Sequence, residues 1–258
     1  MLAHDAYGDE GSPRLLLLHG WPLHRAIWSD VAPRLADAGF RVLCPDLPGF
    51  GESPPLPSDR WTVEAFAEEV ATFVRGTGTS RIAVAGHSFG GYVALALADV
   101  ARDRLAGLGL VASRTIPDSE TARAGRYATI EKVRAQGAQA LLPDLPVKLL
   151  APDSPESLRA RAQQAIEGCP SEAIVAGLTA MAVRPDRTAV LESLPRPLLV
   201  LHGDADQLIP VSQAVQPARQ AGPMDRVILP GVGHMPMWEA PGETADAIRG
   251  WARSAHGG

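Results

Sequence analysis

Little in this sequence points to a nucleic-acid partner, a membrane or export. The 258 residues carry a net charge of −5 and no basic tract, which gives no reason to expect binding to nucleic acid. No apolar run reaches the length of about 18 residues that a membrane-spanning helix requires. The N-terminal residues lack the positive and apolar regions of a signal peptide. We therefore expect a cytoplasmic protein that binds neither membrane nor nucleic acid.

Cysteine is scarce as well. Cys44 and Cys169 lie far apart in the chain, and without an export signal we expect free thiols rather than a disulfide. The length suits a single α/β domain that buries roughly 75% of the surface of the unfolded chain. No exposed apolar helix demands a partner, so the oligomeric state stays open.

Short apolar runs alternate with amphipathic stretches along much of the chain. The runs predict strands at residues 15–18, 41–44, 82–85, 108–112, 198–201 and 227–229. The stretches between them predict helices at residues 27–38, 62–75, 92–101, 210–220 and 241–252. Most of the strands are apolar throughout, as in a parallel sheet covered on both faces. The alternation predicts an α/β fold with a doubly wound, mostly parallel sheet.

This rhythm breaks between about residues 113 and 193, where helix-like stretches follow one another with little strand signal. They cover residues 119–136, 154–167 and 171–183, with Ser154 as a helix cap and Pro155 as the first helical residue. We expect a helical cap inserted into one α/β domain and acting as a lid, with extra packing on one flank as the alternative. The apolar connector 141–150 either lines a substrate pocket or docks this cap.

The most informative segment is Gly-His-Ser-Phe-Gly-Gly at residues 86–91. It places Ser88 in a Gly-x-Ser-x-Gly pattern after a predicted strand and before a predicted helix. This is the context of a nucleophile elbow, a strained turn that exposes a reactive serine. Gly86 and Gly90 leave room where strand and helix backbones approach each other. Ser88 is therefore the candidate nucleophile.

A serine hydroxyl needs a base within hydrogen-bond reach, and that base needs an orienting acid. Asp206 lies in the loop after the strand at 198–201 and is favoured as the acid. Asp204, nearer the strand end, competes for this role but is better placed to brace the turn. His234 follows two glycines after the next strand and suits the base. The chain order Ser, Asp, His is that of the hydrolases built on such an elbow.

The oxyanion of the transition state requires hydrogen-bond donors. One is the backbone amide of Phe89, directly after the nucleophile. The other is expected from the loop after an early strand, where the amide of Trp21 is the candidate because Pro22 has no N–H. We expect His19 to hold this loop through its side chain rather than to act on substrate.

With these residues in place, the chain resembles the α/β-hydrolase superfamily, in its compact bacterial serine esterase and lactonase branch. The resemblance covers nearly the whole chain and is carried by HGWP at 19–22, DLPGFGES at 46–53, GHSFGG at 86–91, GDAD at 203–206 and GVGH at 231–234. It implies an eight-stranded sheet and a helical cap after the sixth strand. The leading segment 2–7 is too short for the usual two opening strands, so we expect a trimmed sheet edge.

The expected function is hydrolysis of a carboxylic ester of a small to medium, partly apolar substrate, without metal or organic cofactor. Related dehalogenases and epoxide hydrolases use an aspartate where this chain has Ser88. The residues expected to line the substrate pocket are Trp21, Phe89, Tyr92, Leu208 and Met235. Trp28 and Trp238 are assigned to packing.

Several alternatives stay open. A cofactor-free perhydrolase or haloperoxidase, a lactonase or a carbon–carbon hydrolase uses the same triad and is not separated from an esterase by it. From another functional class, a ligand-binding receptor with this fold and negligible turnover is the main rival. The physiological substrate lies beyond what the spacing of motifs reveals.

Overall fold

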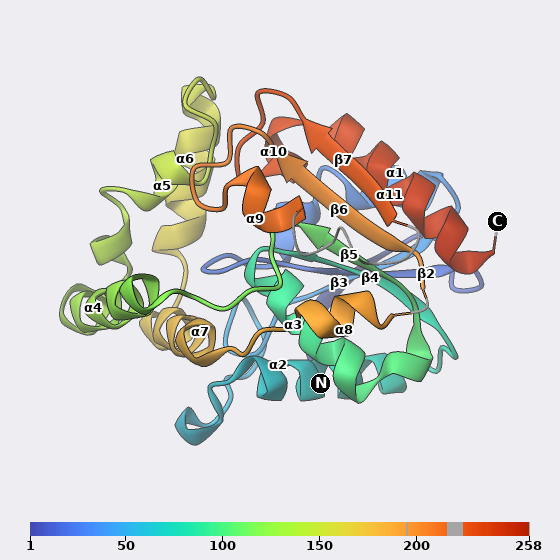
Figure 1. Ribbon diagram of the computed structural model, residues 1–258, viewed down its shortest axis with the longest axis horizontal. Helices are drawn as coiled ribbons and strands as arrows, with labels where there is room; N and C mark the ends of the chain where they lie inside the picture. The colour runs from blue at the N-terminus through green and yellow to red at the C-terminus, as the bar shows by residue number, and fades with distance from the viewer. Residues whose placement is uncertain (195, 216–223, 258) are drawn as a thin grey trace.

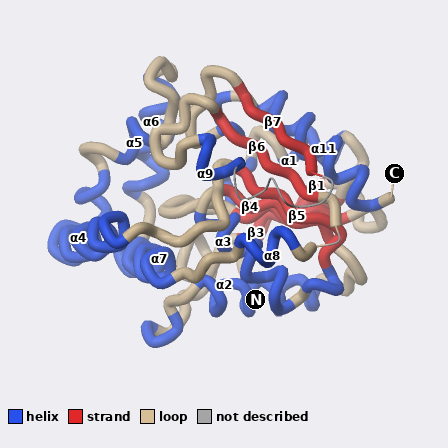
Figure 2. Tube along the Cα trace, viewed as in Figure 1, coloured by secondary structure: helices blue, strands red, loops and turns tan. Residues whose placement is uncertain are grey.

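A seven-stranded sheet lies at the centre of the structure, with helices on both faces (Figures 1 and 2). The structure is a computed structural model and describes residues 1–194, 196–215 and 224–257. The strands are β1 (His4–Tyr7), β2 (Arg14–Leu18), β3 (Arg41–Pro45), β4 (Ile82–His87), β5 (Leu105–Val111), β6 (Leu198–Gly203) and β7 (Met224–Leu229). Their order is β1-β3-β2-β4-β5-β6-β7, and of these described strands only β1 runs antiparallel to its neighbour. The predicted doubly wound, mostly parallel α/β sheet is confirmed.

The strands in the middle of the sheet bring their carboxyl ends to one edge. His87 at the end of β4 is paired with Val111 at the end of β5, and Gly203 at the end of β6 with Leu229 at the end of β7. Every residue of β4, β5 and β6 is buried, because helices cover both faces of these apolar strands. Loops leaving this edge are therefore held close together by a rigid sheet, the usual place for binding sites in such folds.

Two groups of helices sandwich the sheet. On one face lie α1 (Ala32–Asp37) and α11 (Pro241–His256), and on the other α2 (Val63–Gly76), α3 (Phe89–Val100) and α8 (Thr188–Glu192) (Figure 1). The shorter α9 (Val211–Val215) and α10 (Pro236–Glu239) follow β6 and β7. Single 3₁₀ turns cover Arg25–Trp28, Ser58–Arg60, Arg102–Arg104 and Gly137–Leu141.

The remaining helices lie between β5 and β6, in the region where the sequence pattern changes. They are α4 (Glu120–Gln136), α5 (Leu145–Lys148), α6 (Glu156–Glu167) and α7 (Ser171–Val183), and with α8 they form the segment called here the insertion. Figure 1 shows α4 to α7 together beyond the carboxyl edge of the sheet. Among the described residues, no single helix is both long and apolar enough to cross a membrane; α6 and α7 pass that test only as a pair bent by 97°.

Some expectations differ from the structure. The sheet has seven strands among the described residues rather than eight, because a single strand, β1, precedes β2; the trimmed edge was anticipated. The insertion consequently follows the fifth strand of this chain and not the sixth. The helix expected at 27–38 is split into a 3₁₀ turn and α1, since Pro33 lies in the first turn of α1, where its missing N–H is tolerated. Of the helix expected at 210–220, α9 is seen, and the rest lies outside the described residues.

Candidate active site

Ser88 occupies the sharp turn between β4 and α3. Its φ of 49° and ψ of −112° lie in a region that non-glycine residues rarely adopt, so the surroundings must hold the turn. The Ser88 amide donates to the Val111 carbonyl at 2.9 Å, and the Ser113 hydroxyl donates to the Ser88 carbonyl at 2.8 Å. A Cβ atom on Gly86 would lie 2.2 Å from the carbonyl oxygen of Gly90, so this position has no room for a side chain. The local geometry is that expected of a nucleophile elbow.

His234 and Asp206 meet at the carboxyl edge of the sheet. His234 Nδ1 donates to Asp206 Oδ2 at 2.7 Å. The other oxygen of Asp206 accepts from the amides of Leu208 at 2.8 Å and Ile209 at 3.0 Å. Burial alone would raise the pKa of Asp206, but the positive charge of His234 and hydrogen bonds from His202 and His234 hold it well below its ordinary value. The carboxylate is thus ionised and fixed in orientation.

The competing carboxylate lies elsewhere. Asp204 accepts a hydrogen bond from the amide of Gly231 at 2.7 Å and braces the loop that follows β7. Of the two candidates, the structure brings Asp206, and not Asp204, into contact with the histidine.

Two further histidines support this pair, and sequence reasoning gave them no role. His202 Nε2 lies 3.1 Å from Asp206 Oδ2 and donates to the carbonyl of Ile209 at 2.8 Å. His87 Nε2 donates to the backbone carbonyl of His234 at 2.8 Å, with the two rings 4.9 Å apart. Burial lowers the pKa of His87 to about 3, so its ring is neutral and acts as a fixed donor.

Ser88 and His234 line one cavity of about 140 Å³. The complete lining is Trp21, Ser88, Tyr92, Arg114, Arg126, Leu145, Met181, Leu208, Ile209 and His234. Trp21, Tyr92 and Leu208 were expected there. Leu145 and Met181 come from α5 and α7, so the insertion supplies part of the wall. This contact is what a lid would make.

Two residues expected in the pocket are not part of its lining. The side chain of Phe89 is fully buried and packs against Phe66 with ring centroids 5.1 Å apart. Met235 is likewise fully buried in the core. Both flank a candidate catalytic residue in sequence, but neighbouring side chains at a tight turn point in different directions, and these two point into the core. Trp28 and Trp238 are buried, as the assignment to packing predicted.

The loop bearing Trp21 lies directly against the elbow. A Cβ atom on Gly20 would lie 2.4 Å from His87 Nδ1 and 3.2 Å from the Cβ of Ser88. His19 holds this loop by accepting from the Leu47 amide at 2.8 Å and donating to the Gly20 carbonyl at 3.0 Å. The Trp21 indole donates to the carbonyl of Ile174 in α7 at 3.0 Å. The loop is therefore fastened both to the loop that follows β3 and to the insertion.

Glu239 is a further residue that sequence reasoning missed. Its carboxylate accepts from the amides of Gly233 at 3.1 Å and Met235 at 3.2 Å, on either side of His234. It also accepts from the Ala151 amide and the Ser154 hydroxyl, each at 2.8 Å. Ser154 was expected to cap α6, but the helix begins at Glu156 with Pro155 in the capping position. Glu239 thus joins the histidine loop to the insertion.

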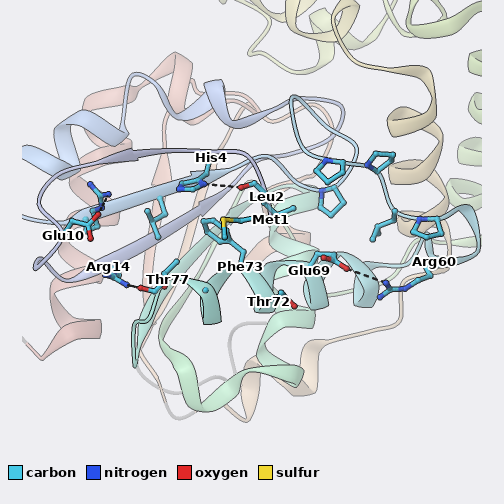
Figure 3. A pocket seen from close by; sticks show the side chains of 18 residues that line it. Met1, Leu2, His4, Glu10, Arg14, Arg60, Glu69, Thr72, Phe73 and Thr77 are labelled. Atoms are coloured by element: carbon cyan, nitrogen blue, oxygen red, sulfur yellow. Dashed lines mark hydrogen bonds and ion pairs between the residues drawn. The ribbon is translucent and has the colours of Figure 1, made fainter.

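A larger cavity, of about 600 Å³, lies apart from these residues (Figure 3). It is formed by the first residues of the chain, the proline-rich loop 54–57 and one side of α2. Figure 3 shows His4 turned to the carbonyl of Leu2, and Arg60 paired with Glu69. Neither Ser88 nor His234 lines it, so size alone does not identify the reactive site. No group of three or more His, Cys, Asp or Glu side chains within the described residues is arranged to hold a metal ion.

Comparison with known proteins gives consistent matches. The model of the alpha/beta hydrolase fold family matches residues 13–241. A thermophilic esterase from Thermogutta terrifontis, solved with malate bound, is 38% identical with a TM-score of 0.92, covering 99% of this chain and 94% of its own. A pimeloyl-(acyl-carrier protein) methyl ester esterase from Methylococcus capsulatus is 34% identical over 207 residues, 77% of this chain and 78% of that protein. A bromoperoxidase from Bacillus anthracis shares the fold at 21% identity, with a TM-score of 0.85 over 97% of this chain and 94% of its own.

Proposed function

The chain belongs to the α/β-hydrolase family, and from that premise we propose that it is a serine-dependent carboxylic ester hydrolase. The observation that supports this most is the cavity shared by Ser88 and His234, together with the 2.7 Å contact between His234 and Asp206. The relatives named as esterases cover most of this chain and favour the same chemistry.

In the proposed mechanism, Ser88 Oγ attacks the ester carbonyl carbon while His234 Nε2 takes the serine proton. Asp206 keeps Nδ1 of His234 protonated and stabilises the imidazolium that forms. The backbone amides of Phe89 and Trp21 donate to the oxyanion. His234 then gives its proton to the leaving alcohol, which departs and leaves Ser88 acylated. A water molecule activated by His234 attacks the acyl-enzyme, and the free acid is released.

The size of the cavity favours a short acyl group. Its volume of about 140 Å³ lies below the roughly 300–1,000 Å³ of ordinary ligand pockets. Trp21, Leu145 and Met181 give its wall a partly apolar character. We expect acetate to butyrate esters to be preferred over decanoate.

The first test is hydrolysis of p-nitrophenyl esters from acetate to decanoate by the wild type and Ser88→Ala. The variant should lose at least about 10³-fold in kcat at unchanged thermal stability, because it lacks the nucleophile. Ser80→Ala, which changes an exposed serine in the loop before β4, is the matched control and should retain full activity. Hydrolysis by Ser88→Ala at the wild-type rate would refute the proposal.

Two parallel assays separate the alternatives. Formation of peracid from acetate and peroxide would favour a perhydrolase, and opening of lactones a lactonase. A fluorophosphonate that labels Ser88 once, with no ester or lactone turned over, would favour a receptor.

A further inference from the structure

Three guanidinium groups surround one buried carboxylate next to the catalytic cavity. Asp118 Oδ1 lies 2.8 Å from Arg114 Nη2, 2.9 Å from Arg184 Nη2 and 3.3 Å from Arg126 Nη2, and Arg126 Nε contacts Oδ2. The Asp118 side chain is 1% exposed. One negative charge thus faces three positive ones, and the cluster keeps an excess of positive charge in a place where water screens it poorly.

Two of these cations line the cavity itself. Arg114 follows Ser113, whose hydroxyl holds the Ser88 carbonyl, and Arg126 reaches in from α4. Arg184 lies behind them, stacked at 4.1 Å on the ring of Tyr92, which is also part of the wall. Ser88 and the two cations therefore border the same small space.

The donors of the two lining arginines are not all used. Arg126 Nη1 has no hydrogen-bond partner among the described residues and is available to a ligand in the cavity, whereas the unpartnered Nε of Arg114 is buried away from it. Arg114 also contacts Gln213 Oε1, a neutral acceptor, so among the described residues its charge is paired only with Asp118, which it shares with Arg126 and Arg184. A guanidinium offers five N–H donors in a flat fork that matches a carboxylate.

Arg114 and Arg126 give the wall of the cavity two positively charged side chains. Within the described part of the chain, no Asp or Glu is among the residues that line it. The excess positive charge is notable in a protein whose net charge is −5. A ligand that brings a carboxylate would supply the missing acceptor.

We propose that this cavity selects esters that carry a carboxylate, which Arg114 and Arg126 bind while the ester carbonyl lies at Ser88. The inference rests on the proposed ester hydrolysis and names its substrate class: short half-esters of dicarboxylic acids, or esters of alcohols or phenols that bear an acid group. The reaction is unchanged, since water cleaves the acyl C–O bond and the second carboxylate takes no part in bond making.

Matched ester pairs test the proposal. Monomethyl glutarate against methyl pentanoate places the charge on the acyl side, and 4-acetoxybenzoate against its methyl ester places it on the leaving group. We expect kcat/KM for the charged member of at least one pair to be roughly 10- to 100-fold higher, the effect of one or two charge-assisted hydrogen bonds. The pair that shows the preference identifies the side on which the anion is bound.

Variants tie the preference to the cluster. Arg126→Gln should reduce the ratio of charged to neutral kcat/KM by about 10-fold, mainly through KM, since it removes a binding contact. Arg134→Gln removes an exposed cation from the same helix and should leave the ratio unchanged. If Arg126→Gln fails to fold, the wild type alone still tests the anion site. The proposal then requires that the ratio of charged to neutral kcat/KM exceed 1 and fall as salt is added, because salt screens the attraction between the arginines and the carboxylate.

The outcomes separate the two proposals. Equal or better hydrolysis of the neutral member in both pairs overturns the anion site and leaves the esterase intact. If the folded wild type hydrolyses none of the four esters and none of the p-nitrophenyl esters, both the esterase proposal and the anion site are overturned.

Discussion

The neutral imidazole of His87 holds His234 by its backbone, through a hydrogen bond of 2.8 Å from His87 Nε2 to the His234 carbonyl. The residue before the proposed nucleophile thereby fixes the position of the proposed base. Strand β4 and the loop after β7, distant in sequence, are joined at this point.

Replacing His87 should impair positioning rather than chemistry. His87→Ala should lower kcat by about 10-fold, because the loop of His234 loses a buried hydrogen bond and its packing. His87→Gln, whose amide reaches close to the position of Nε2, should recover most of this loss. Since the pKa of His87 is about 3, the midpoint of the acid limb of the rate profile should stay at its wild-type value in both variants. A shifted midpoint in His87→Gln would contradict this role.

Asp206 and Asp204 form a matched pair of carboxylates for a second test. Asp206→Asn should reduce kcat by about 10³- to 10⁴-fold, because the amide cannot stabilise the imidazolium of His234. Asp204→Asn, which alters a turn, should cost less than about 10-fold. Steady-state kinetics of the two variants at pH 7 compares them. Comparable losses would argue that Asp204 shares the orienting role.

The lowered pKa of Asp206 also has a consequence for pH dependence. A carboxyl group whose folded pKa lies below its unfolded value stabilises the fold above the unfolded value, and this contribution is lost as the pH falls through the folded pKa. Because its lowered pKa also keeps Asp206 ionised at pH 5 and above, its protonation should not limit wild-type activity in that range. A wild-type rate that falls with the square of the proton concentration below pH 7, as it does when two groups must lose a proton, would contradict this expectation.

Glu239→Gln tests the junction between the histidine loop and the insertion. The amide keeps the shape of the carboxylate but offers one oxygen to four donors, so we expect a loss of about 2 kcal/mol in stability. Proteolysis near residues 151–154 should become faster, because the loss of the acceptor frees this connector. Glu243→Gln, an exposed change in the first turn of α11, is the control. Unchanged unfolding and proteolysis in Glu239→Gln would show that the junction contributes little.

Asp118→Asn probes the arginine cluster through stability. Burial would raise the pKa of Asp118, but hydrogen bonds and charges from Arg126 and Arg184 lower it to about 2. Its contribution, about 2 kcal/mol, should be fully present above its ordinary value of 3.8 and lost as the pH falls towards 2. Denaturant unfolding of both proteins between pH 2 and 7 measures it. A stability difference that is constant across this range would contradict the assignment.

The sheet and the elbow could be predicted from the sequence because their signals are local. Apolar runs mark buried parallel strands, and the glycines around Ser88 mark a tight turn wherever the rest of the chain lies. Choosing Asp206 over Asp204 depended only on position along one loop. These features need no knowledge of long-range contacts.

The supporting shell could not be predicted because it depends on tertiary contacts. Arg126 is one of several arginines on a largely exposed helix, and only the packing of α4 directs it towards the cavity. Glu239 ends the short helix α10, where no sequence pattern marks it, and its four donors come from two segments far apart in sequence. The prediction for Phe89 was wrong in the other direction, since it placed a core residue in the pocket. Its neighbour Ser88 lines the cavity, while the Phe89 ring is buried in the core.

The hydrogen bond from the Trp21 indole to Ile174 joins the loop of the proposed oxyanion donor to α7, which supplies part of the cavity wall. The residue whose amide is the proposed oxyanion donor is anchored, through its side chain, to the helix that would have to move for a bulky substrate to enter. A ligand that displaces α7 would therefore also loosen the donor it needs. We therefore expect the site to disfavour large substrates for two reasons: the cavity excludes them, and their entry would displace the proposed oxyanion donor.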